Sequence, residues 1–261
     1  MANGLIRTEA IVLRTYRLAE ADKIVVALGV DTGMVRGVAR GARRLKNRFG
    51  AGLEIWTVIN LEFFAKEQRE LVSLRAAEII ITSFKLATHD EAVTTLDYLS
   101  DLLIAFVPPG EPNPKVYRMA KSCLLALQNA PEKSILLSRY FELWLLKLSG
   151  FLPNFILCQR CGRDFDLKRK AAFGAQGTLV CLDCSERAAF YLSVEGLREL
   201  HLMRRSAPEK YLQQYSAGAN AEVGEWTRGI IERVLERPFE DKTQVRDFRQ
   251  ATRWEASVRT E

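Results

Sequence analysis

The sequence predicts an α+β protein in which an N-terminal β-barrel precedes an α-helical domain that carries an inserted four-cysteine knuckle. Three observations favour this fold class. Short runs of β-branched and aromatic residues fill positions 1–81, and from residue 88 onward apolar residues recur with a helical period. Four of the five cysteines lie between residues 158 and 184. We therefore expect a barrel over 1–81 and a helical domain over 82–261, with the knuckle at about 155–190.

The first unit contains about five runs of strand length. The first run surrounds Ile11 and Leu13, and the others are KIVVALGV, MVRGVARG, EIWTVINLEFF and ELVSLRAAEIII. Asp31-Thr32-Gly33 predicts a turn between the second and third runs. About five short strands in so short a segment are typical of a small closed barrel, most often the oligonucleotide-binding (OB) fold. We therefore predict an OB-fold barrel.

The second unit is expected to be a set of helices with recognisable ends. Thr88 and Glu91 have the spacing of a capping box and predict the start of the first helix, which ends before Pro108-Pro109-Gly110. The remaining boundaries are capping or stopping residues: Asn113-Pro114 before the second helix, Pro131 before the third, Gly150 and Pro153 after it, and Ser193 before the fourth. A last helix is expected over about 221–237, before a polar C-terminal stretch that should fray.

The clustered cysteines form the pattern C-x₂-C-x₁₉-C-x₂-C, made by Cys158, Cys161, Cys181 and Cys184. Each pair can direct two thiolates at one ion, and four thiolates complete the tetrahedron that zinc prefers. Such a site leaves no open position for substrate, so we predict one structural Zn²⁺ per chain. A disulfide pair, an iron–sulfur cluster and unligated thiols are the alternatives. Gly174 and Gly177 suggest a hairpin between the two pairs, and Cys123 is expected to be a small buried apolar residue.

Composition and missing motifs narrow the function. The chain has a formal net charge of +6, and we find neither a signal-peptide core nor an apolar run long enough to cross a membrane, so we expect a cytoplasmic protein. It lacks the P-loop pattern of ATP-hydrolysing proteins. Neither of its two histidines, His89 and His201, lies near a nucleophile or carboxylate pattern. We therefore expect no catalytic activity and no catalytic residues.

The strongest binding signal is a basic segment in the barrel. No acidic residue lies between Asp31 and Glu54, and six cations do: Arg36, Arg40, Arg43, Arg44, Lys46 and Arg48. Interspersed glycines would let such a segment follow a phosphate backbone closely, so it predicts contact with nucleic acid. The competing interpretation is a solvated, mobile loop. For the nearby Phe49, Trp56, Phe63 and Phe64 we favour core packing over base stacking. Arg204-Arg205 is more simply a charge pair at a helix C-terminus.

These segments together resemble the RecO family of bacterial recombination mediators and DNA repair proteins. The resemblance covers most of the chain and rests on EAIVLRTYRLAEADKIV, GMVRGVARGARRLKNRFG, FELWLLKLSGFLPNFILCQRCG, GTLVCLDC and YLSVEGLREL. Leu45 and Asn47 depart from the family pattern, in which proline and serine are frequent at these positions. Some members lack the cysteines, so the resemblance does not make the metal indispensable.

The resemblance implies an OB barrel followed by a helical bundle that bears the knuckle. It also implies binding of single- and double-stranded DNA, annealing of complementary strands without ATP, and partnership with RecR. Contact with single-strand-binding protein and assistance in loading RecA follow from the same resemblance, as does a place in the cytoplasm with the nucleoid. The matching positions are the six cations for DNA and the four cysteines for metal.

Three other hypotheses remain at this point. A zinc-ribbon protein of transcription or translation, binding RNA or proteins, would also explain a knuckle and a basic loop. A metal-dependent nuclease or other DNA enzyme would show turnover of DNA with Mg²⁺ or Mn²⁺. A scaffold whose basic surface is incidental would bind no polyanion. Of these, the zinc-ribbon protein is the main alternative.

Overall fold

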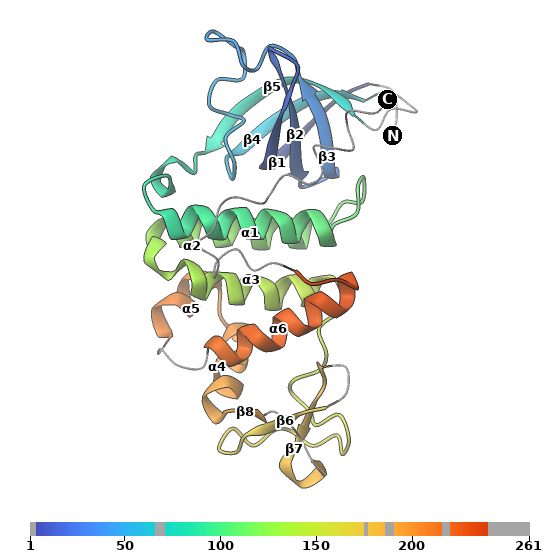
Figure 1. The fold of residues 1–261 in the computed structure, drawn as a ribbon, viewed down its shortest axis with the longest axis vertical. Coiled ribbons are helices and arrows are strands. Elements are labelled where there is room, and N and C mark those ends of the chain that lie inside the picture. Colours follow the sequence, from blue (N-terminus) through green and yellow to red (C-terminus); the bar gives the residue numbers. More distant parts are fainter. Residues whose placement is uncertain (1–3, 66–70, 175–176, 186–190, 216–219, 240–261) are drawn as a thin grey trace.

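The computed structural model describes residues 4–65, 71–174, 177–185, 191–215 and 220–239. A β-barrel forms one end of the molecule, a small sheet forms the other, and the helices lie between them (Figure 1). The order of the chain therefore follows the long axis, except that the last two helices return to pack beside the third (Figure 1). In the part of the chain that is described, no helix is both long and apolar enough to cross a membrane.

Five strands close the barrel, as the sequence predicts: β1 (Gly4–Leu18), β2 (Asp22–Gly29), β3 (Gly33–Ala39), β4 (Val58–Ala65) and β5 (Val72–Ile81). The order around the barrel is β1-β2-β3-β5-β4, with β1 paired to both β2 and β4. All pairs are antiparallel except β3 with β5. This is the topology of the OB fold. The turn expected at Asp31-Thr32-Gly33 is present, with Gly33 in the left-handed region at φ 67°.

Each of the first three strands contains a run of residues that is apolar on both faces, because both faces are buried there. One face fills the barrel interior, where Val12, Val25 and Val35 meet the inward side chains of β4 and β5. The other face, which includes Leu13 and Leu28, belongs to the same apolar core as the helices. A strand that is buried on both sides has no polar face, which explains the continuous apolar runs in this part of the sequence.

Two strands differ from the sequence prediction. The first is much longer than the run around Ile11 and Leu13, and the fourth starts at Val58 although its apolar run begins at Glu54. Trp56 breaks the strand pattern, because its backbone is left-handed (φ 60°) and its fully buried indole reaches the first helix. There Nε1 donates to the carbonyl of Leu96 at 2.7 Å and to Ser100 Oγ at 2.9 Å. Tertiary packing thus overrides strand propensity at this position.

Six α-helices are described: α1 (Asp90–Phe106), α2 (Pro114–Asn129), α3 (Ser134–Leu148), α4 (Val194–Arg205), α5 (Pro208–Gln214) and α6 (Asn220–Leu235). Asn113 caps α2 by accepting from the N–H of Val116, and Ser193 caps α4 by accepting from Gly196, as the sequence predicts. The short α5 was not expected, and a 3₁₀ turn (η2, Pro131–Lys133) precedes α3. The polar C-terminal stretch from residue 240 lies outside the described residues.

The capping box predicted at Thr88 and Glu91 is wrong. The helix begins at Asp90, and His89 occupies the N-cap position without a side-chain hydrogen bond to the helix. The two acidic residues of the first turn, Asp90 and Glu91, supply the favourable charge at this helix end instead. A short 3₁₀ turn (η1, Phe84–Leu86) precedes the helix, and the carbonyl of Leu86 accepts a hydrogen bond from the N–H of His89.

Polar contacts join the barrel to the helices around the shared apolar core. The guanidinium of Arg14 on β1 forms ion pairs with Asp97 and Asp101 of α1. On the same strand, Glu9 accepts hydrogen bonds from Lys121 (2.6 Å) and Tyr117 (2.7 Å) of α2. Burial works against it, yet these two donors and the lysine charge lower the pKa of Glu9 below its ordinary value. The carboxylate therefore stays ionised and keeps both contacts at neutral pH.

Candidate metal centre and nucleic-acid interface

A three-stranded sheet brings the two cysteine pairs together. β6 (Ala171–Phe173) and β7 (Leu179–Cys181) form the hairpin that the glycines indicate, and β8 (Tyr191–Leu192) pairs with the other edge of β6. Cys181 ends β7, and Cys184 closes the following 3₁₀ turn (η4, Leu182–Cys184). The first pair lies on a tight turn in which the N–H of Gly162 donates to the carbonyl of Cys158 at 2.9 Å.

The sulfur atoms fit a single tetrahedral ion. All four Sγ atoms lie within 4.8 Å of one another, and those of Cys161 and Cys181 are 3.8 Å apart. Sulfurs bound at about 2.3 Å to a tetrahedral zinc are separated by about 3.8 Å, so little adjustment is needed. None of the four cysteines forms a disulfide bond in this structure. The donor set and its spacing are compatible with a metal site.

The protonation chemistry of these thiols also favours a cation. The guanidinium of Arg163, followed by its backbone N–H, lowers the pKa of Cys161 to about 6. Burial raises the pKa of Cys158, but hydrogen bonds from backbone N–H groups outweigh this effect and leave the pKa below its ordinary value. At Cys184, first the contact with Cys181, then burial and the other two sulfurs raise the pKa to about 12. A bound metal ion would compensate the negative charge of the thiolates, and a thiol that coordinates such an ion is deprotonated outright.

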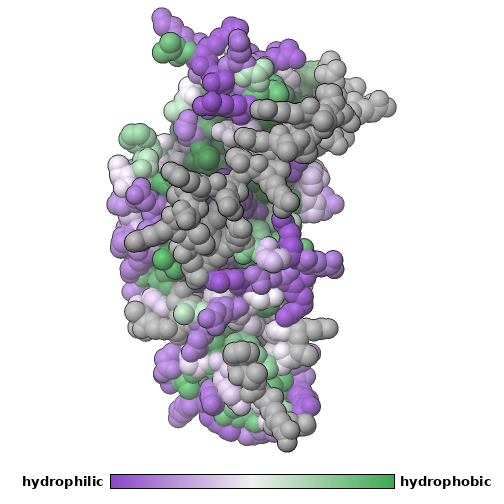
Figure 2. Space-filling view, in the orientation of Figure 1, coloured by the Kyte–Doolittle hydropathy of each residue, from purple (hydrophilic) through white to green (hydrophobic). Residues whose placement is uncertain are grey.

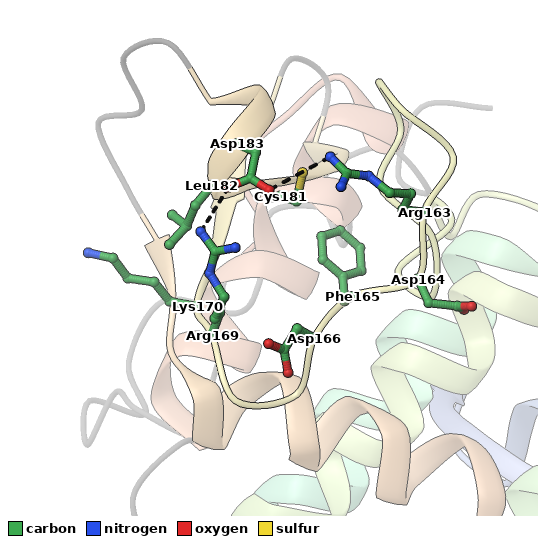
Figure 3. Close-up of a pocket in the computed structure, with 9 residues that line it drawn as sticks. All are labelled: Arg163, Asp164, Phe165, Asp166, Arg169, Lys170, Cys181, Leu182 and Asp183. Atoms are coloured by element: carbon green, nitrogen blue, oxygen red, sulfur yellow. Dashed lines mark hydrogen bonds and ion pairs between the residues drawn. The ribbon is translucent and has the colours of Figure 1, made fainter.

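Charged side chains that sequence reasoning missed brace the second cysteine pair. Asp183, between the cysteines of this pair, forms ion pairs with Arg169 at 2.9 Å and with Arg163 at 3.7 Å. Both arginines, which lie on the loop between Cys161 and β6, and Asp183 of η4 line a pocket beside Cys181 (Figure 3). The arginine pairs lower the pKa of Asp183, Arg169 first. Because Arg163 also donates to the sulfur of Cys161, at 3.4 Å, it connects the two cysteine turns.

The predicted cations extend from β3 into the loop that follows it, residues 40–57, which we call the basic loop. All six side chains are exposed to solvent. Within the described residues, none of the six forms an ion pair with a carboxylate. Figure 2 shows hydrophilic side chains gathered at the tip of the barrel end, with some apolar side chains among them. Five of the six lie on one loop, so the structure keeps them close in space.

The basic loop is held in place by its own apolar and polar side chains. Phe49 and Leu53 are buried in the barrel core, which fixes the second half of the loop against the sheet. The side chain of Asn47 donates to the carbonyl of Arg44 and accepts from the N–H groups of Phe49 and Gly50, at 2.9–3.0 Å. The alternative of a mobile, merely solvated loop is therefore disfavoured.

The six cations are not equivalent. Arg43 donates to the carbonyls of Ala19 and Glu20, and Arg48 donates to Leu74 on β5 while stacking over the ring of Phe49. Arg40, Arg44 and Lys46 have no side-chain hydrogen bond or ion pair with any residue that the structure describes. Among the cations of the basic loop, these three are therefore fully available to an external anion, whereas Arg43 and Arg48 also stabilise the loop.

Arg36 stands apart from the loop. Arg36 lies on the same outer face of β3 as Met34 and Val38. Buried residues of this face, such as Met34, belong to the helical core. The pKa of Tyr16 is raised, mainly by burial, and the positive charge of Arg36 partly offsets this rise. Two other cations lie nearer the loop. Arg17 on β1 lies opposite Lys23 on β2 in the strand register, and Lys23 lies opposite Ala39, where the basic loop begins. Sequence reasoning missed them because strand pairing, not sequence proximity, brings them there.

The aromatic residues near the basic loop are mainly core. Phe49, Trp56 and Phe63 are buried, and Phe64 is half-buried on β4. The preference for core packing is therefore confirmed for the first three. Cys123 is fully buried, and burial raises the pKa of its thiol well above the ordinary value. Arg204 and Arg205 lie in the last turn of α4, as expected of cations at a helix C-terminus.

Comparison with known proteins shows the family. Residues 1–83 match the family model described as Recombination protein O N terminal, and residues 91–243 match Recombination protein O C terminal. The DNA repair protein RecO of Koribacter versatilis is 30% identical over 237 residues, which cover 88% of this chain and 94% of that protein. The DNA repair protein RecO of Geobacter metallireducens is 34% identical over 184 residues, covering 70% and 74%. That of Syntrophotalea carbinolica is 28% identical over 258 residues, covering 97% and 98%. The chain therefore belongs to the RecO family.

Proposed function

We propose that this protein is a DNA-binding recombination mediator in recombinational DNA repair, without catalytic activity of its own. The observation that carries the proposal is the set of exposed cations on an OB barrel, which no described carboxylate neutralises. The relatives with which the chain aligns are named DNA repair proteins, which supports the same function. The DNA-contacting residues are Arg36, Arg40, Arg43, Arg44, Lys46 and Arg48.

Strand annealing is the activity that such a surface can perform without ATP. Two complementary strands repel each other through their phosphates, and this repulsion opposes pairing. A cationic surface that holds both strands releases their counterions and raises the local concentration of each strand near the other. The basic loop is suited to this task because Phe49 and Leu53 anchor its backbone in the barrel core, so that the backbone need not be ordered when DNA binds.

The metal site has a structural part in the proposal. Cys158, Cys161, Cys181 and Cys184 would hold one Zn²⁺, which would stabilise the cysteine turns by joining two segments of chain. Four thiolates leave no coordination position for a substrate. The charged residues around them brace the turns and do not point to a reaction.

Protein partners complete the proposed function. The protein would act with RecR on DNA coated by single-strand-binding protein, and so assist the loading of RecA. It would act in the cytoplasm, where the nucleoid lies. These assignments rest on the family to which the chain belongs, and the surface that meets each partner is a separate question.

The annealing proposal is tested with two complementary strands coated with single-strand-binding protein. We expect the purified protein to accelerate duplex formation without ATP, measured by the loss of a fluorescence signal when a dye and a quencher meet. Unchanged annealing would contradict the proposal. Turnover of labelled DNA with Mg²⁺ would contradict the absence of catalysis, and preferential binding of RNA in direct competition would favour the zinc-ribbon alternative.

The residues are tested by removing the cations that have no structural task. Arg40, Arg44 and Lys46 are replaced together by alanine, and binding of single-stranded DNA is measured over a range of salt concentrations. Each lost phosphate contact lowers the slope of log affinity against log salt by about 0.7, so the slope should fall by about 2 in total. A matched control replaces Lys115, Arg118 and Lys210, which are exposed on α2 and α5. An equal loss in both variants would show a net-charge effect and overturn the assignment.

A further inference from the structure

One side chain of the basic loop is neither charged nor buried. Leu45 lies between Arg44 and Lys46 and has a relative exposure of 105%, the highest of the large apolar residues among those described. The next highest, Phe84 at 79%, lies in η1, away from the loop. A fully exposed leucine gains nothing from the fold, so its apolar surface is available to a partner.

The loop presents this leucine on a fixed backbone. Asn47 bonds to the carbonyl of Arg44 on one side of Leu45 and to two backbone N–H groups on the other. Before the leucine, the N–H of Arg43 donates to the carbonyl of Ala21 at 2.9 Å. Both chain segments that lead to the leucine are therefore held, and its side chain needs little further ordering on binding.

The neighbours of Leu45 define what kind of partner it meets. Arg44 and Lys46 have no ion-pair partner in the described structure, and such cations bind phosphates. If Arg44 and Lys46 hold successive phosphates, the exposed side chain of Leu45 between them would lie within reach of the bases that these phosphates connect. In a duplex the flat faces of the bases are covered by stacking, whereas an unstacked base in a single strand exposes its face. Some DNA-binding proteins insert leucine and similar apolar side chains between the base steps of a duplex and must pay the cost of unstacking them. A base that is already unstacked in a single strand offers the same apolar face without that cost.

We propose that Leu45 packs against an unstacked base and makes the basic loop prefer single-stranded over duplex DNA. This inference rests on the proposed DNA-binding function and adds to it the residue that discriminates between the two DNA forms. Arg44 and Lys46 bind the backbone of either form, and Leu45 contributes only where a base is free of its neighbours.

The test compares Leu45→Ala with wild type and with two controls. Affinities for an oligothymidine strand and for a hairpin duplex are measured by fluorescence anisotropy at several salt concentrations. Leu45→Ala should weaken single-strand binding about fivefold, with an unchanged salt slope and unchanged duplex affinity. Lys46→Ala should weaken both forms and lower the salt slope by about 0.7–0.9. Leu5→Ala, which removes an exposed leucine from β1, should change neither form.

A second measurement reports the base contact directly. A single strand containing 2-aminopurine should change its fluorescence when wild-type protein binds, and Leu45→Met, which keeps an apolar side chain, should preserve the change. Leu45→Ala should remove most of it. If wild type binds DNA but Leu45→Ala has no effect, or weakens both forms equally, the inference about Leu45 is wrong. If wild type shows no salt-dependent DNA binding at all, the proposed function itself fails.

Discussion

The basic loop and the cysteine knuckle are both irregular, cation-bearing segments, but they are held by different means. The loop is anchored by the buried side chains of Phe49 and Leu53 and by the hydrogen bonds of Asn47. In the knuckle, Cys158 and sheet residues such as Leu179 are buried in the helical core, but Cys161 is exposed and Cys181 and Cys184 are only half-buried. The comparison teaches that apolar contacts order the loop, whereas three of the four cysteines lack such cover, and under the proposed function a metal ion would hold their turns.

Metal removal should give the largest effect and should be confined to the knuckle. A structural zinc contributes on the order of 10 kcal/mol of folding free energy to a small site. After chelation, or in Cys158→Ser, amide hydrogen exchange should become fast in β7 and η4 and stay slow in β1–β5. The measurement is hydrogen exchange followed by mass spectrometry, together with the metal content of the native protein.

Cys123→Ala serves as the control for this experiment. The thiol is buried in the helical core, far along the chain from the other four cysteines, so the variant should keep about one zinc per chain. Slow exchange in the knuckle after complete chelation would contradict the dependence on metal. It would show that the knuckle, like the basic loop, is held by protein contacts alone.

A second prediction concerns the anchor of the basic loop. Phe49 is 2% exposed and packs in the barrel core, so Phe49→Ala should lower the free energy of unfolding by about 3–5 kcal/mol. Single-strand affinity should fall as well, because the cations lose their fixed support. Phe84→Ala, at an exposed position, should change the free energy of unfolding by less than about 0.5 kcal/mol. Both variants are compared with wild type by urea titration. Equal losses of unfolding free energy in the two variants would contradict the role of Phe49 as a buried anchor of the loop.

The smallest effect is expected from the polar support of the loop. Asn47→Ala removes three hydrogen bonds at a half-buried position and should cost about 1 kcal/mol of stability. Metal content should be unaffected, which separates the loop from the knuckle. Asn60→Ala, at an exposed site on β4, provides the matched control and should leave thermal unfolding unchanged. A drop in metal content in Asn47→Ala would contradict the independence of the two segments.

The sequence by itself determined the features that depend on neighbouring residues. The cysteine spacing predicts the ligand set, because each pair is joined by a two-residue turn. The caps at Asn113 and Ser193 are local hydrogen bonds and were predictable for the same reason. The charge of the basic segment is likewise a property of composition over a short window.

Only the tertiary structure decided which faces and charges remain free. The outer face of β1–β3 is buried because helices pack on it, and Arg14 is neutralised by Asp97 and Asp101, more than 80 positions along the chain. The left-handed conformation of Trp56 follows from its contacts with α1. Such contacts join residues far apart in sequence, so no local pattern encodes them. The availability of Arg44 and the exposure of Leu45 are decided in the same way, by which partners the fold brings near and which it keeps away.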